Sequence, residues 1–245
     1  MSETIYHGCY FNTETLESPK DSLLYATAPT PAVKEFLLTH EYDYLKNKDL
    51  AFLRCPSHQD WMKNVFAIKS WQDIELDVHK DSVSSEVMTQ QYFDNYVNAT
   101  DGHIRFYQIG QFRYFYTDMP SLVVSQYPAM MSDNQFTRDC MFVPGSLDIG
   151  KHQRSLSVGF KVRNGVKKIS IKRGDTLYYL KLHTDKKLKL QEFVPTSRVH
   201  DLYCGVQLSG ENEVRPWKPL QFYYDVFQKK NVKKLIKKEI IENLI

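Results

Sequence analysis

The chain has 245 residues, enough for one large domain or two small ones, and 42% of them are hydrophobic, which excludes wholesale disorder. Its formal net charge of +3 is too small to imply a nucleic-acid or membrane partner by itself. The four cysteines form no C-x-x-C pair and do not suggest a disulfide framework, so a reducing cytosol is favoured. No signal peptide and no membrane-spanning apolar run is expected.

The first part of the chain predicts an arm followed by a helix. Residues 1–30 are polar and irregular, and we expect a peripheral N-terminal arm. Residues 31–48 read as a helix, because Pro31 suits a first turn and the apolar residues that follow have helical spacing. The apolar run "LAFLRCP" (50–56) is expected to end at Pro56. We treat residues 31–245 as a single β-rich domain.

The middle of the chain predicts strands. Residues 102–118 read as two strands broken at Gly110, and 156–162 alternate apolar and polar residues, as a strand with one buried face does. Asn164-Gly165 is a strong signal for a tight turn. The expected fold is mainly β, a β-clip or barrel-like body with one N-terminal and one C-terminal helix. The other expected strands lie at 65–70, 74–80, 121–128, 167–173, 176–182 and 187–193.

The last segment, residues 225–245, predicts a basic amphipathic helix. Its apolar stripe favours docking on the body or on a protein partner, because an isolated helix needs packing to be stable. Binding to nucleic acid or to an anionic surface through its lysines is the alternative. The stripe comprises Val232, Leu235, Ile236, Ile240 and Leu244. The lysines are Lys229, Lys230, Lys233, Lys234, Lys237 and Lys238.

The candidate site is the turn "GSLDIGKHQR" (145–154). A carboxylate such as Asp148, held rigidly in a turn, can act as a general base, but turn aspartates more often accept hydrogen bonds from their own backbone, and we favour that role. Lys151 and Arg154 flank it as candidate ligand-binding residues, since both can hold a phosphate or carboxylate. The alternative is a solvated strand start or an ion pair with Asp148.

Two further sequence patterns concern nucleic-acid binding and metal binding. Arg113, Tyr114 and Tyr116 mix basic and aromatic side chains in one strand, which can stack on single-stranded nucleic acid. A strand whose aromatic side chains face the core is the favoured interpretation. The eight histidines show no metal-binding spacing, so no metal site is predicted.

Residues 143–182 resemble the central motif of the dUTPase and dCTP deaminase superfamily. The matching positions are Gly145, Asp148, Lys172, Gly174 and Asp175. The resemblance implies a nucleotide hydrolase in which Asp148 activates water near Mg²⁺. Mg²⁺ is the cofactor that this resemblance implies. Apart from it, the sequence leaves the cofactors unknown.

A broader resemblance links the chain to an uncharacterised family of tailed-phage (cyanophage-type) proteins. It rests on residues 54–78, 145–154 and 171–185. It implies a phage protein found in the cytoplasm of an infected bacterial host or in the virion. The leading hypothesis is therefore a protein that acts through binding or assembly, with a protein partner or self-association, rather than through catalysis. The alternative hypothesis is the dUTPase-like hydrolase.

Overall fold

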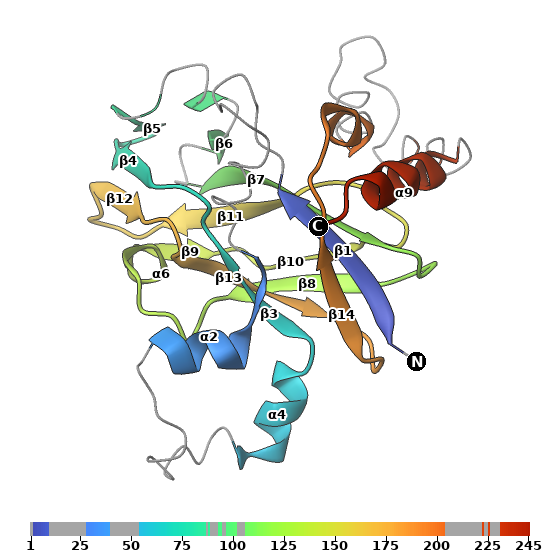
Figure 1. Cartoon of the computed structure of the whole chain (residues 1–245). Coiled ribbons are helices and arrows are strands. Elements are labelled where there is room, and N and C mark those ends of the chain that lie inside the picture. Colours follow the sequence, from blue (N-terminus) through green and yellow to red (C-terminus); the bar gives the residue numbers. More distant parts are fainter. Residues whose placement is uncertain are drawn as a thin grey trace.

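The computed structural model contains three β-sheets and short helices around them (Figure 1). Strand character dominates, with a helix in the N-terminal part of the chain and one at the C-terminal end, so the mainly β expectation is confirmed. In the described part of the chain the sheets do not close into a barrel. The structure describes residues 2–9, 28–39, 54–86, 88, 93–94, 97–101, 106–203, 222, 225 and 231–245.

The largest sheet has six strands, and β7 lies at its centre. Its β1 and β14 pair in parallel, and its other pairs are antiparallel. In spatial order the strands are β14 (Leu188–Glu192), β1 (Glu3–Cys9), β7 (Phe106–Thr117), β11 (Leu156–Val162) and β9 (Cys140–Phe142), with β6 (Val97–Asp101) also paired to β7. We call this the large sheet.

Two antiparallel sheets complete the body. The five-stranded sheet runs in the order β10 (Gly145–Asp148), β8 (Val123–Pro128), β13 (Thr176–Leu182), β3 (Val65–Lys69) and β2 (Thr30–Pro31). The three-stranded sheet runs β12 (Lys168–Ile171), β4 (Ile74–Val78) and β5 (Val83–Ser84). The helices discussed below are α2 (Ala32–Thr39), α4 (Pro56–Met62), α6 (Gln135–Asp139) and α9 (Val232–Glu242).

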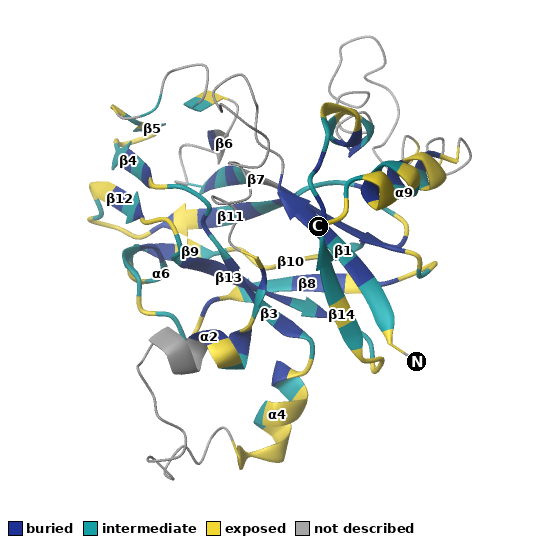
Figure 2. Cartoon of the chain, in the orientation of Figure 1, coloured by how far each residue is buried: buried dark blue, intermediate teal, exposed yellow. Residues whose placement is uncertain are grey.

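The main core lies between the sheets and follows the alternation seen in the sequence. In β11 the alternate residues Leu156, Val158, Phe160 and Val162 are buried. Five consecutive residues at the start of β13 are buried because this strand is covered on both faces (Figure 2). On its outer face Tyr179 joins a second cluster that contains residues of α2 and α4. The positions of these two helices therefore depend on the five-stranded sheet.

One stretch of chain belongs to two sheets. Strand β9 pairs with β11 of the large sheet, and β10 pairs with β8 of the five-stranded sheet. The Val143 N–H donates to Gly159 O at 2.8 Å, at the place where the chain leaves β11. The next residue, Pro144, has no N–H with which to continue the ladder. The two sheets therefore diverge at Pro144, and we call this place the fork.

The N-terminal segment differs from the expectation. Residues 1–30 were expected to form a peripheral arm, but Glu3–Cys9 forms strand β1, which pairs with β7 on one side and β14 on the other. Ile5 is fully buried there, and Cys9 nearly so. The partners are distant in sequence, so the segment alone gave no sign of them. Residues 10–27 of the expected arm lie outside the described residues.

The local structure differs from the expectation, or adds to it, at three places. Helix α4 begins where the apolar run was expected to end, because proline suits the first turn of a helix. Helix α6 was not expected, and the side chain of Asn134 caps it by accepting a hydrogen bond from Thr137 N. The expected break at Gly110 is wrong: β7 runs from 106 to 117, with a shift in its register to β11 opposite this place.

The C-terminal helix docks on the body, as its apolar stripe predicted. Its residues Val232, Ile236 and Ile240 are buried against a cluster that includes Tyr114 and Tyr116 of β7. Helix α9 lies beside β1 (Figure 1). The predicted apolar stripe included two residues that are not buried, because Leu235 and Leu244 are 41% and 38% exposed.

The start of this helix also differs from the expected residue 225. Asn231 has a left-handed backbone conformation (φ 55°), so the helix begins at Val232. Residues 226–230 lie outside the described residues. None of the helices described is both long and apolar enough to cross a membrane.

We predict that Ile236→Ala lowers the free energy of unfolding by about 2–4 kcal/mol, because it leaves a cavity beneath α9. Ile236 is fully buried, whereas Ile241 on the same helix is 50% exposed. Ile241→Ala is the matched control and should change stability by less than about 0.5 kcal/mol. Urea denaturation of both variants measures this. Equal losses for both variants would mean that α9 is not docked as described.

Candidate ligand site at the fork

Asp148 lies at the end of β10, and its carboxylate joins two segments of chain. Its Oδ1 accepts hydrogen bonds from Leu122 N at 2.9 Å and Gly150 N at 3.0 Å. Its Oδ2 accepts from the Ser121 hydroxyl at 2.6 Å and lies 3.2 Å from the Lys151 ammonium. A carboxylate has about four lone-pair sites, and these four donors occupy them. Asp148 therefore holds its own turn to the start of β8.

These donors keep the Asp148 carboxylate ionised. Partial burial by itself raises its pKa, but the hydrogen bonds from Ser121, Leu122 N, Lys151 and Gly150 N outweigh that effect and lower the pKa to about 2. A general base that works near neutral pH needs a pKa closer to 7. The geometry and the pKa therefore both favour the structural role for Asp148.

A close approach of two segments supports this turn. A Cβ on Gly150 would lie 2.7 Å from Ser121 Cα and 2.8 Å from Ser121 N, closer than real Cβ atoms come to backbone. The sequence Asp148-Ile149-Gly150 thus combines a carboxylate that binds the neighbouring segment with a glycine that lets it approach. Lys233 of α9 donates to Gly150 O at 2.9 Å and to Met119 O at 3.0 Å, and so fixes the same place from outside.

The two candidate ligand-binding residues have different environments. Lys151 forms the ion pair with Asp148 that the sequence left as one alternative. Arg154 does not: within the described residues its guanidinium has no hydrogen bond and no ion pair. It lies instead in the lining of a pocket. The structure therefore separates the two residues, and Arg154 alone faces a space that a ligand can enter.

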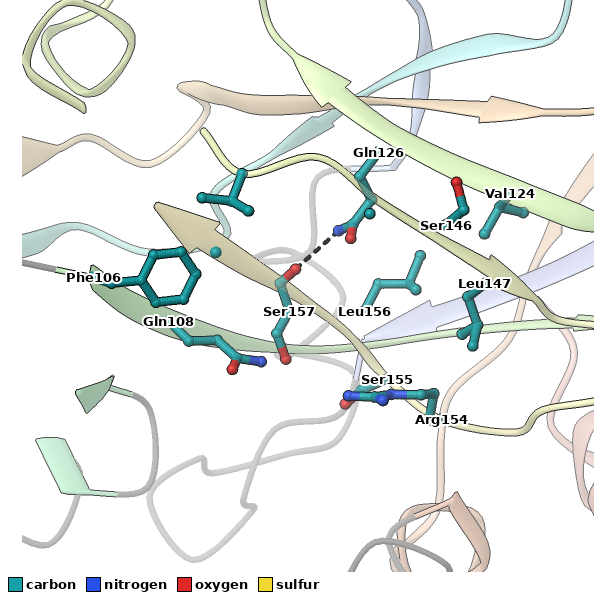
Figure 3. A pocket seen from close by; sticks show the side chains of 13 residues that line it. Phe106, Gln108, Val124, Gln126, Ser146, Leu147, Arg154, Ser155, Leu156 and Ser157 are labelled. Atoms are coloured by element: carbon teal, nitrogen blue, oxygen red, sulfur yellow. Dashed lines mark hydrogen bonds between the residues drawn. The ribbon is translucent and has the colours of Figure 1, made fainter. Parts of the chain in front are cut away.

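That pocket, the fork pocket, has a volume of about 230 Å³ and lies between β10 and β11 (Figure 3). It exists because β10 leaves β11 at Pro144, so that the facing edges of these strands are not paired with each other. The Gln126 side chain spans part of the gap and donates to Ser157 O at 2.9 Å. Polar lining comes from Arg154, Gln108, Gln126, Ser146, Ser155 and Ser157, and apolar lining includes Leu147 and Leu156.

A chain of hydrogen bonds that starts at Ser146 of β10 was not found from the sequence. Ser146 Oγ lies 2.7 Å from Ser125 Oγ, which lies 2.8 Å from His183 Nε2. The Ser146 hydroxyl points away from Leu147 in Figure 3, as successive residues of a strand do. The three residues come from β10, β8 and the end of β13, so only knowledge of the strand pairing would reveal them. Cross-strand hydroxyl pairs of this kind stabilise a sheet.

The structure limits two surfaces for which nucleic-acid binding is the alternative interpretation. Arg113, Tyr114 and Tyr116 are 1%, 0% and 3% exposed, so the core interpretation is confirmed and these rings cannot stack on a base. On α9, Lys233 donates to the body, and Lys237 pairs with Asp118 at 2.8 Å.

The remaining lysines of the predicted basic surface fall into two groups. Lys234 and Lys238 are exposed, and Lys238 lies 3.9 Å from Glu242 of the same helix. Lys229 and Lys230 lie outside the described residues. Across the ranges that the structure describes, no three His, Cys, Asp or Glu side chains are grouped closely enough to hold a metal ion.

We predict that Asp148→Asn lowers the free energy of unfolding by about 1–3 kcal/mol at pH 7, because it weakens hydrogen bonds made to a charged acceptor. The folded-state pKa lies below the ordinary aspartate value of 3.8, so this stabilisation is present above about pH 4 and is lost as the pH falls towards 2. The difference between variant and wild type should shrink over that interval in urea denaturation.

The matched control for this measurement is Asp185→Asn, because Asp185 is fully exposed and makes one ion pair with Lys63 at 3.4 Å. It should change stability by less than about 0.5 kcal/mol at either pH. A difference for Asp148→Asn that does not depend on pH would contradict the assigned role of the carboxylate charge.

Comparison of the chain with protein-family models, with curated proteins and with solved structures found no match. The resemblances to the tailed-phage family and to the dUTPase superfamily therefore stay predictions from the sequence. Any functional conclusion depends on the site itself.

Proposed function

We propose that the protein acts by binding rather than by catalysis, and that the fork pocket receives a small anionic group, a carboxylate or a phosphate. The observation that carries this proposal is the guanidinium of Arg154, which lines a polar pocket and has no ionic partner among the described residues. A half-buried cation without a counter-ion favours an anionic ligand.

The other groups in the pocket suit the same ligand. Arginine presents a planar set of donors that match two oxygen atoms of a carboxylate or phosphate. The hydroxyls of Ser155 and Ser157 and the amide of Gln108 add neutral donors around it. The volume of about 230 Å³ lies below the roughly 300–1,000 Å³ of pockets that enclose drug-sized ligands. A small acid, or one acidic side chain of a partner, fits better than a whole nucleotide.

The alternative function is a dUTPase-like hydrolase in which Asp148 activates water near Mg²⁺. A base must have a free lone pair within reach of the water, and a carboxylate that binds Mg²⁺ must give it an oxygen. Both oxygens of Asp148 already accept two contacts each from the chain. This argues for the binding function over the hydrolase.

A binding function agrees with the assembly role that we expect from the tailed-phage resemblance. The proposed location, the cytoplasm of an infected host or the virion, depends on that resemblance alone. Of the basic surface on α9, Lys234 and Lys238 remain for a partner, since Lys233 and Lys237 bind the body. We therefore place the first binding site at the fork and not on α9.

We predict that inorganic phosphate or a short dicarboxylate such as succinate binds the wild-type protein and that Arg154→Ala weakens this binding at least about tenfold, as the loss of a charged hydrogen bond implies. Isothermal titration calorimetry measures the affinities. Arg173→Ala, which removes an exposed arginine outside the pocket, is the control and should bind like the wild type. Equal affinities for Arg154→Ala and wild type would overturn the assignment of the pocket, and so would no binding of either anion up to ~10 mM.

The alternative function has its own test. Purified protein is incubated with deoxy- and ribonucleoside triphosphates and Mg²⁺, beside the Asp148→Asn variant. We expect no turnover by either protein. Turnover that the variant loses would identify Asp148 as a catalytic base and replace the binding proposal.

A further inference from the structure

A second pocket, which we call the methionine pocket, lies between α6, β9 and the chain that follows β8. Its volume is about 380 Å³, and it shares no lining residue with the fork pocket. Its inner wall is apolar and well packed, because Phe136 and Leu177 are 1% and 0% exposed. The volume falls within the range of pockets that enclose small organic ligands.

Two methionines line this pocket and are exposed to solvent. Met130 is 62% exposed and Met141 is 51% exposed. Methionine side chains are flexible and polarisable, so they adapt to apolar ligands of different shapes. Exposed apolar side chains gathered at a pocket are typical of binding sites. The methionine pocket therefore offers its apolar contact at the opening, above a closely packed floor.

The charge of the lining is positive. It contains Arg138, Arg163 and Asp133, which gives 2 − 1 = +1 formal charge. Asp133 pairs with Arg138 at 3.0 Å. In the part of the chain that the structure describes, the Arg163 guanidinium has no carboxylate partner. Arg163 is therefore the charge that remains for a ligand.

The other polar groups of the lining already have partners. The Thr137 hydroxyl donates to Ser132 O at 3.0 Å and to Asn134 O at 2.9 Å. The Ser132 hydroxyl accepts from Asn134 Nδ2 at 3.2 Å. A ligand rich in hydroxyls or amides would find few new hydrogen bonds there. An apolar ligand with one negative charge matches what the pocket offers.

We propose that the methionine pocket binds a small amphipathic carboxylate, with its apolar part against Met130 and Met141 and its carboxylate on Arg163. This site is independent of the fork pocket and of the function proposed for it. The exposed methionine side chains supply affinity through buried area, and the arginine selects the charge.

Octanoate and its uncharged analogue 1-octanol are the probes. Spectra of protein labelled with ¹³C in the methionine methyl groups report the site directly, and Met130→Leu and Met141→Leu assign the two signals. Octanoate should shift the Met130 and Met141 signals and should bind at least about tenfold more tightly than 1-octanol. Arg163→Ala should remove that preference and leave the binding of 1-octanol unchanged. Arg163→Lys should restore part of it, and Arg173→Ala should behave like the wild type.

Three results would overturn the proposal. Octanoate and 1-octanol that bind equally to the wild type would mean an apolar surface without a carboxylate site. Shifts confined to other methionines would place the binding elsewhere in the molecule. No shift with octanoate, together with a shift caused by an acidic apolar peptide, would replace the small acid with a protein partner. Because Arg163 is exposed and outside the core, its variants are expected to fold.

Discussion

The arrangement of the molecule depends on one backbone constraint, which is that residues 140–148 are shared between two sheets. The chain pairs with β11 as far as Gly159 O and then, beyond Pro144, pairs with β8. Proline cannot donate to a ladder, so the change of partner at this place carries no unpaired N–H. Residues 140–148 thus connect the two sheets, and beyond Pro144 the edges of the two sheets lie apart. The fork pocket is the space that this separation leaves.

Polar groups maintain the divergence of the sheets. The Asp148 carboxylate holds the end of β10 to the start of β8, and Gln126 spans the opening to Ser157. Lys233 of α9 binds the backbone of the same turn from the opposite direction. The residues that look most like a catalytic turn in the sequence are thus used to fix the geometry, and the neighbouring Arg154 lines the fork pocket instead.

The sequence predicted what depends on local pattern. The alternation in 156–162, the turn at Asn164-Gly165 and the apolar stripe of α9 were all readable, because each is set by neighbouring residues. Gly165 has the positive φ (84°) that such a turn needs. What depends on distant partners was not readable: the parallel pairing of β1 with β14, the change of sheet at Pro144, and both pockets. In the candidate site, the sequence identified residues 148 and 154, but only the three-dimensional structure showed that their roles differ.

Strand β1 lies inside the large sheet, between β7 and β14, and this position has a consequence for folding during synthesis. This strand is synthesised before both of its partners, β7 and β14, and the second of these ends only at Glu192. Until then its buried residues are exposed, and at least one of its two edges is unpaired and available to other chains. A topology of such long sequence separation folds slowly, because chain closure must come before the contacts that stabilise it. The large sheet is therefore completed late, and newly made chains are at most risk of aggregation in the interval before residues 188–192 arrive.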